Sequence, residues 1–192
     1  MVSARVVALA LLVLPTAGLI APLSAQSSAL ILFAHVGRHS PLVNLSDAGD
    51  DFAPAFSYGG GLALQVSDRA AIRLGVTRHR TRYRGETASL ADSSSTRYVI
   101  AADVQIGWPT TSALVPYVFF GGGALTTQFD DPGVSPATNA MGRFGIGLNR
   151  VGGLGAWFLE FGTMLYQFNG LGFERLQFDL QARLGFALAV GI

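Results

Sequence analysis

The chain has 192 residues, of which 50% are hydrophobic and only 13% are charged, against about 25% charged residues in a typical soluble domain. All 13 basic residues are arginine and 12 acidic residues nearly balance them, which excludes general nucleic-acid binding. Cysteine is absent, so disulfide bonds, thiol nucleophiles and cysteine metal sites are excluded as well. Beyond the N-terminus, no apolar stretch reaches the roughly 18–20 residues of a transmembrane helix.

Residues 1–25 have the three parts of a secretory signal peptide. Arg5 is the only charge among the first 37 residues, the apolar run 6–14 follows it, and small residues precede the expected cleavage site. An uncleaved membrane anchor is the less favoured alternative, because the run is short and prolines interrupt the segment. We therefore expect an exported mature domain of residues 26–192.

The mature part alternates between bulky apolar residues and polar or small ones. From Leu176 to Ile192 every even position is apolar and every odd position is polar or small. Such alternation indicates a β-strand, because successive side chains point to opposite faces. The pattern predicts eight strands, which in chain order are 30–36, 56–66, 72–77, 98–108, 115–129, 140–148, 154–168 and 176–192.

The predicted connections alternate in length. Those at 67–70, 109–112 and 151–153 are short, whereas those at 38–55, 84–96, 129–138 and 169–175 are longer and rich in Asp, Ser, Gly and Pro. Short turns at one end and long loops at the other are typical of an outer-membrane barrel. The sequence therefore predicts an all-β fold, a closed up-and-down antiparallel transmembrane barrel of eight strands.

Alternation alone leaves open which face is outside, since a soluble lipocalin-like barrel would turn its apolar face inward. Two features favour lipid outside. The polar face consists mostly of Gly, Ala, Ser, Asn and Gln, with no lysine, which is unlike a surface in water. Eight strands also enclose an interior only wide enough for side chains, which suits inward residues such as Gly145, Gly147 and Gly185.

Aromatic residues gather toward the two ends of the predicted strands, as expected for girdles at the membrane interfaces. With the N-terminus in the periplasm, the expected girdle residues are Trp108, Trp157 and Tyr117 near the inner rim and Tyr58, Tyr98 and Tyr166 near the outer rim.

The signal peptide, the eight alternating segments, the tight inner turns and the amphipathic C-terminal strand resemble the small outer-membrane barrels of Gram-negative bacteria, the OmpA-, OmpX- and OmpW-like proteins. The resemblance covers residues 26–192 and concerns architecture more than activity. It implies an outer-membrane location, contact with outer-membrane lipid, and insertion by the barrel-assembly machinery. In that family the last residue is usually aromatic, so Ile192 is a departure from the family's insertion signal.

Charged residues on the inward face must be paired, because burying a lone charge costs several kcal/mol. We expect them to form a salt-bridge network that plugs the lumen, with a proton path or small pore lining as the alternative. The residues of this predicted network are Arg73, Asp103, Arg143, Glu160, Asp179 and Arg183.

Arg78, Arg80 and Arg82 continue the outward face above the apolar part of their strand. An arginine costs little at the membrane interface, and its guanidinium pairs well with phosphate. Two interpretations stay open: contact with lipopolysaccharide, or a solvated strand extension that limits aggregation.

Catalysis needs a nucleophile and a base within hydrogen-bond reach. The candidates His39, Ser40, Asp92 and Ser93 lie in predicted loops, and the adjacent His39 and Ser40 would face apart on a strand. No His or carboxylate cluster has metal-binding spacing. We therefore expect no enzyme, no cofactor and no metal, and a structural or surface-interaction role. The alternatives are a narrow channel for small or hydrophobic solutes, and a lipid A-modifying enzyme.

Overall fold

The computed structural model describes residues 29–85, 93–108, 110–152 and 155–190, so the predicted signal peptide lies outside the described residues. The strands in this part of the chain are β1 (Leu30–Pro41), β2 (Asp51–Phe52), β3 (Ala55–Gln65), β4 (Ala70–Arg84), β5 (Ser94–Gly107), β6 (Leu114–Phe129), β7 (Ala137–Gly152), β8 (Gly155–Gly170) and β9 (Phe173–Val190). The described segments contain no helix that is long and apolar enough to cross a membrane.

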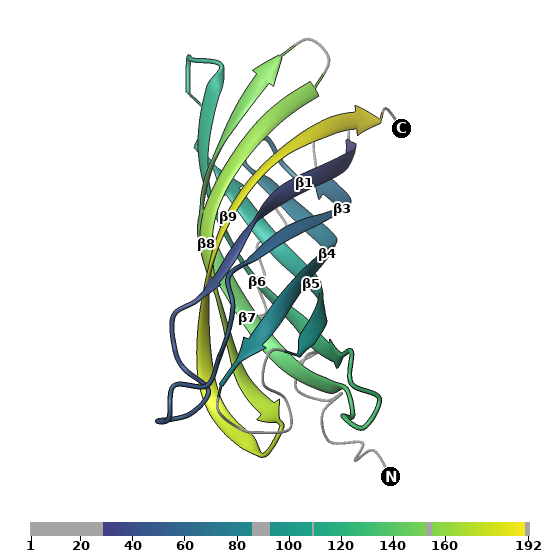
Figure 1. Ribbon diagram of the computed structural model, residues 1–192. Coiled ribbons are helices and arrows are strands. Elements are labelled where there is room, and N and C mark those ends of the chain that lie inside the picture. The colour runs from purple at the N-terminus through teal and green to yellow at the C-terminus, as the bar shows by residue number, and fades with distance from the viewer. Residues whose placement is uncertain (1–28, 86–92, 109, 153–154, 191–192) are drawn as a thin grey trace, which may run out of the picture.

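Eight long strands form a closed antiparallel barrel, as predicted (Figure 1). Each strand pairs with its neighbours in the chain, and β1 closes the barrel by pairing with β9 from Leu30 opposite Val190 to Pro41 opposite Asp179. The short β2 is not one of the eight barrel strands and pairs with the end of β4. The fold class read from the alternation is therefore confirmed.

The connections define two different ends. We call the end with the β3–β4 and β5–β6 connections the turn end; it lies at the top of Figure 1 and also holds the start of β1. The opposite end, with residues 42–54 between β1 and β3 and residues 130–136 between β6 and β7, is the loop end.

One predicted long loop, 169–175, is wrong. β8 and β9 continue to Gly170 and from Phe173, and only Leu171 and Gly172 lie between them. These two residues have φ of 56° and 80°, the left-handed pair that a tight two-residue hairpin turn requires. The glycine makes the turn possible, and the strands on both sides keep pairing to its edge.

The bulky side of the alternation faces outward. Leu74, Ile146 and Phe161 are 55%, 61% and 52% exposed, whereas their polar neighbours on the same strands point into the barrel. Because aliphatic and aromatic side chains cover the outside of every long strand, the barrel presents an apolar belt of the kind that hydrocarbon solvates.

Four of the predicted girdle aromatics lie on the outside, but Tyr117 and Tyr166 do not. Trp108, Trp157 and Tyr58 are exposed, and Tyr98 is half-buried on the outer surface. The correction for Tyr117 and Tyr166 follows from the alternation itself, because Tyr117 shares the inward face of Phe119 and Tyr166 that of Glu160. Both phenols are buried and hydrogen-bonded to charged groups inside the barrel.

Candidate functional site

Five charged side chains from five strands meet in the middle of the lumen, and we call them the central cluster: Arg73, Asp103, Arg143, Glu160 and Arg183. Arg143 donates from both Nε and Nη2 to the Asp103 carboxylate, with Nε 2.6 Å from Oδ1. Arg73 bridges the two acids, bonding Glu160 and lying 3.5 Å from Asp103. Arg183 completes the cluster, with Nη2 2.7 Å from Glu160 Oε2.

The central cluster has three guanidinium groups and two carboxylates, so its formal charge is +1. The ring of Phe119 lies among the three cations, at 5.0 Å from Arg73, 5.8 Å from Arg143 and 5.5 Å from Arg183. An aromatic face attracts a cation within about 6 Å. Phe119 therefore offsets part of the repulsion among the arginines without adding a carboxylate.

Tyr117 supports the same cluster from the turn end. Its hydroxyl donates to Glu160 Oε1 at 2.8 Å. Gly147 stands opposite Tyr117 in the β6–β7 register. A Cβ atom at this glycine would lie 2.3 Å from Cζ of the Tyr117 ring. Glycine at 147 is therefore what lets the phenol lie flat against the wall and reach the carboxylate.

Asp179 belongs to a second cluster nearer the loop end, not to the central one. Its partner is Arg97, whose Nη1 lies 3.2 Å from Asp179 Oδ2 and whose Nη2 bonds the Tyr166 hydroxyl. All three are buried. Sequence analysis missed Arg97, although the outward position predicted for Tyr98 already places residue 97 on the inward face.

Other buried polar side chains also fill the lumen. His35 is hydrogen-bonded to Thr77 at 3.1 Å, and the rings of His39 and His79 stack with centroids 4.3 Å apart. His39 faces the lumen, but the adjacent Ser40 lies on the outer wall. These two residues therefore form no nucleophile–base pair. Of the other candidates, Asp92 lies outside the described residues.

The connection 42–54 folds into the loop end of the barrel and caps it. Leu45 and Phe52 are almost completely buried, and Phe52 packs edge-on against Tyr83 and Phe168 at 6.0 and 5.7 Å. The Tyr83 hydroxyl donates to Asp50 at 2.8 Å. The guanidinium of Arg97 lies 4.8 Å from the Phe52 ring centroid, so the cap rests directly on the second cluster.

The cap was not foreseen from sequence, because connections are expected on the surface. Its signal was the bulky apolar residues Leu45 and Phe52 within 44–52, where the other residues are polar or small. Asp51 precedes Phe52 and accepts its backbone N–H at 2.6 Å. Burial raises the pKa of Asp51 above its ordinary value.

The predicted arginine row lies on the outside of β4 toward the loop end. Arg78 donates to the Tyr58 hydroxyl at 2.9 Å and lies over the Tyr98 ring. Arg80 pairs with Asp130 at 2.6 Å. Arg82 has no acidic partner among the described residues. With Arg80, it lines a polar hollow of about 710 Å³ whose other lining residues are Ala53, Pro54, Thr81, Arg84 and Ser94.

No described group of three or more His, Cys, Asp or Glu side chains is arranged to hold a metal ion. What the described residues build instead is an occupied lumen. It contains the central cluster, a second ionic cluster, buried histidines and an apolar cap. Chemically this arrangement holds charges in fixed pairs away from bulk water.

Comparison with solved structures finds similar barrels, whereas no protein-family model and no curated protein matches the chain. Neisserial surface protein A has a TM-score of 0.63 at 15% identity, over 84% of this chain and 97% of that one. OprG of Pseudomonas aeruginosa has a TM-score of 0.55 at 12% identity, over 87% and 98% of the two chains. AlkL in lipid bilayers has a TM-score of 0.53 at 18% identity, over 87% and 92%. The chain therefore has the fold of the small eight-stranded outer-membrane β-barrels.

Proposed function

We propose that this protein is a closed, non-conducting barrel of a bacterial outer membrane, with its loop end at the cell surface and a structural or surface-interaction role. The observation that carries the proposal is the filled lumen. The central cluster, the Arg97–Asp179 pair and the Phe52 cap follow one another along the barrel.

The two ionic clusters obstruct the passage of solutes through the lumen. Each carboxylate in them accepts hydrogen bonds from guanidinium or phenol groups at the same level of the barrel. Breaking a buried ion pair by removing one partner typically costs about 3–5 kcal/mol. A solute passing through would have to separate such pairs and also displace the apolar cap.

Conductance in planar bilayers tests the proposal. Wild-type protein is expected to show no large steady openings. The paired variant Asp103→Ala with Arg143→Ala removes a carboxylate and a guanidinium together and should raise conductance measurably. The matched control, Arg80→Gln with Asp130→Asn, removes an exposed pair and should stay silent. Large steady openings of the wild-type barrel would instead support the alternative function, a narrow channel.

The arginine row supports a contact with anionic lipid at the outer surface. Arg78, Arg80 and Arg82 lie on the loop-end side of the apolar belt. A guanidinium group can bind two oxygens of one phosphate at the same time. We assign this contact to lipopolysaccharide. Replacing the three arginines with Gln should weaken lipopolysaccharide binding, and unchanged binding would leave the row as a solvated extension of β4.

A lipid-modifying activity finds no support in the geometry of the described residues. His39 points into the lumen and Ser40 lies on the outer wall. The solved barrels of similar fold include a surface protein by its printed name. We therefore propose a non-enzymatic role; hydrolysis or acyl transfer on lipid A by the purified barrel would contradict it.

A further inference from the structure

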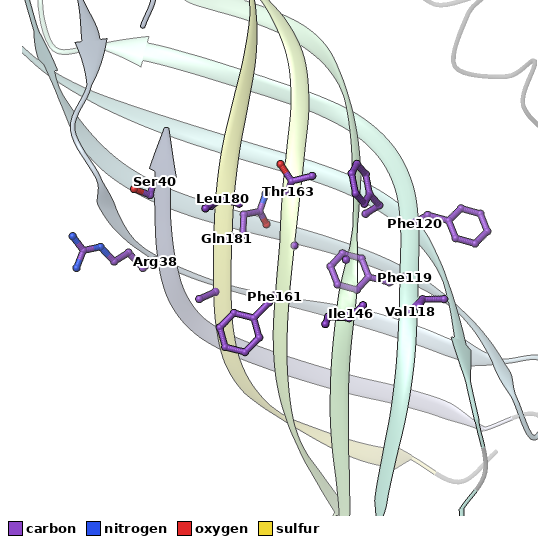
Figure 2. Close-up of a pocket in the computed structure, with 14 residues that line it drawn as sticks. Arg38, Ser40, Val118, Phe119, Phe120, Ile146, Phe161, Thr163, Leu180 and Gln181 are labelled. Carbon is purple, nitrogen blue, oxygen red and sulfur yellow. The ribbon is translucent and has the colours of Figure 1, made fainter. Parts of the chain in front are cut away.

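A groove of about 820 Å³ runs across the outer wall over β6, β7, β8, β9 and the end of β1 (Figure 2). Its volume lies in the range of roughly 300–1,000 Å³ that is usual for ligand sites. Val118 and Phe120 stand at one side, Arg38 and Ser40 at the other, and Phe161 between them. The walls are almost entirely apolar, and most of the side chains that form them are on the outer apolar belt, whereas Phe119 and Gln181 contribute from the lumen side.

The groove lies where outward side chains are small, at Thr163 and Ala182, and the backbone at Gly145 and Gly162 lines its centre. Gly145 and Gly162 stand opposite each other in the β7–β8 register. From inside, the Phe119 ring packs against them so closely that a Cβ atom at either glycine would lie 2.7–2.8 Å from Cζ. The outward neighbours Phe144, Ile146 and Phe161 rise around this glycine pair and leave a hollow between them.

Arg38 gives the groove a charged end. It is exposed on the outer face of β1, directly opposite Ala182 of β9. None of the described residues forms an ion pair or a hydrogen bond with its guanidinium. An unpaired cation beside an apolar hollow matches a molecule with an anionic head and an apolar tail, and phosphate is the anion that guanidinium binds best in two-pronged fashion.

We propose that the groove binds lipopolysaccharide, with one acyl chain lying over Gly145 and Gly162 and a lipid A phosphate pairing with Arg38 and Ser40. Arg38 lies on the loop-end half of β1, so the headgroup belongs to the outer leaflet. This assignment of leaflet rests on the proposed function, in which the loop end faces the cell surface. The site itself is distinct from the lumen and from the arginine row on β4.

Lipid binding by the full mature barrel in detergent micelles tests the site, with native mass spectrometry as the readout and purified lipid A and phosphatidylglycerol as probes. Arg38→Gln should weaken lipid A binding about tenfold, the loss expected for a charge-assisted hydrogen bond. Ala182→Phe places a ring in the groove opposite Arg38 and should weaken binding to a similar extent.

Two outward positions away from the groove serve as controls. Arg150 is an exposed outward arginine at the turn end of β7, and Ala102 is an exposed outward alanine of β5. Arg150→Gln and Ala102→Phe should leave lipid A binding unchanged. Equal losses in the controls, unchanged binding in Arg38→Gln, or equally tight binding of phosphatidylglycerol would overturn the site.

Folding of every variant is checked by gel electrophoresis in SDS, in which a folded barrel migrates differently before and after heating. If Ala182→Phe does not fold, Arg38→Gln decides alone. A conducting wild-type barrel would remove the proposed function but leave the groove testable, whereas loss of the groove would leave the closed lumen unaffected.

Discussion

Asp103 on β5 and Arg143 on β7 are joined across the intervening β6 by two hydrogen bonds, from Nε and Nη2 of the arginine to the two carboxylate oxygens. Gly121 of β6 lies opposite both residues in the two registers. A Cβ at Gly121 would lie 2.5 Å from Asp103 Oδ1. The ion pair therefore depends on a bare backbone between its partners.

Replacing one partner of this ion pair should lower the free energy of unfolding more than replacing both partners. Arg143→Met leaves Asp103 buried with only the distant Nη2 of Arg73, and should lower the free energy of unfolding by about 3–5 kcal/mol. Asp103→Leu combined with Arg143→Met should lower it by clearly less, since no lone carboxylate remains. Urea unfolding of the barrel in lipid vesicles, followed by tryptophan fluorescence, gives both values. Equal losses for the single and the paired variant would contradict a coupled pair.

Gly147→Ala should disturb the central cluster through Tyr117. The added methyl group overlaps the phenol ring, so the ring must move and Glu160 loses a hydrogen-bond donor. Overpacking of this kind costs about 1–3 kcal/mol. Gly142→Ala is the matched control on the same strand, because the nearest atom to its Cβ, the Gly121 carbonyl oxygen, is 3.9 Å away. A loss of stability in Gly142→Ala as large as in Gly147→Ala would show that any alanine in β7 is harmful.

The cap should open when its aromatic anchor is removed. Phe52→Ala leaves a hole between Tyr83 and Phe168 and takes the ring away from Arg97. Truncation of a buried phenylalanine typically costs about 3–5 kcal/mol. Since the cap is a connection, we expect the loss to appear locally, as faster proteolysis and faster amide exchange in residues 42–54. Leu42→Ala is the control, because Leu42 is 59% exposed in the same connection.

Sequence alternation was sufficient to predict the barrel, its closure and the inward position of the charges in the central cluster, because a period of two assigns each side chain to a face. The same rule, applied to every residue, would have placed Tyr117, Tyr166 and Arg97 inside as well. The two tyrosines were assigned to the girdle because they are aromatic and lie near a rim. Whether a side chain points inward or outward is decided by its face of the strand, not by its position along the strand.

The alternation does not predict which residues contact each other across the lumen. Asp179 could pair with any inward arginine on the sequence alone, and the strand stagger brings it to Arg97 rather than to the central cluster. The burial of Phe52 depends on the path of a connection that has almost no regular pairing of its own. The groove on the outer wall depends on which outward side chains stand side by side on neighbouring strands, which follows from register rather than from pattern.

The exposed pair of Arg80 and Asp130 should contribute far less than the buried ones. Their side chains are 66% and 47% exposed, so water and salt screen the attraction even though the atoms are 2.6 Å apart. Asp130→Asn should therefore change the free energy of unfolding by less than about 1 kcal/mol, and added salt should erase the difference. Arg97→Gln is the comparison, because it strands Asp179 in the lumen, where salt cannot reach it. Urea unfolding at low and at high salt gives the loss of stability for both variants. If the loss for Asp130→Asn were as large and as independent of salt as the loss for Arg97→Gln, burial would not explain the strength of the lumen pairs.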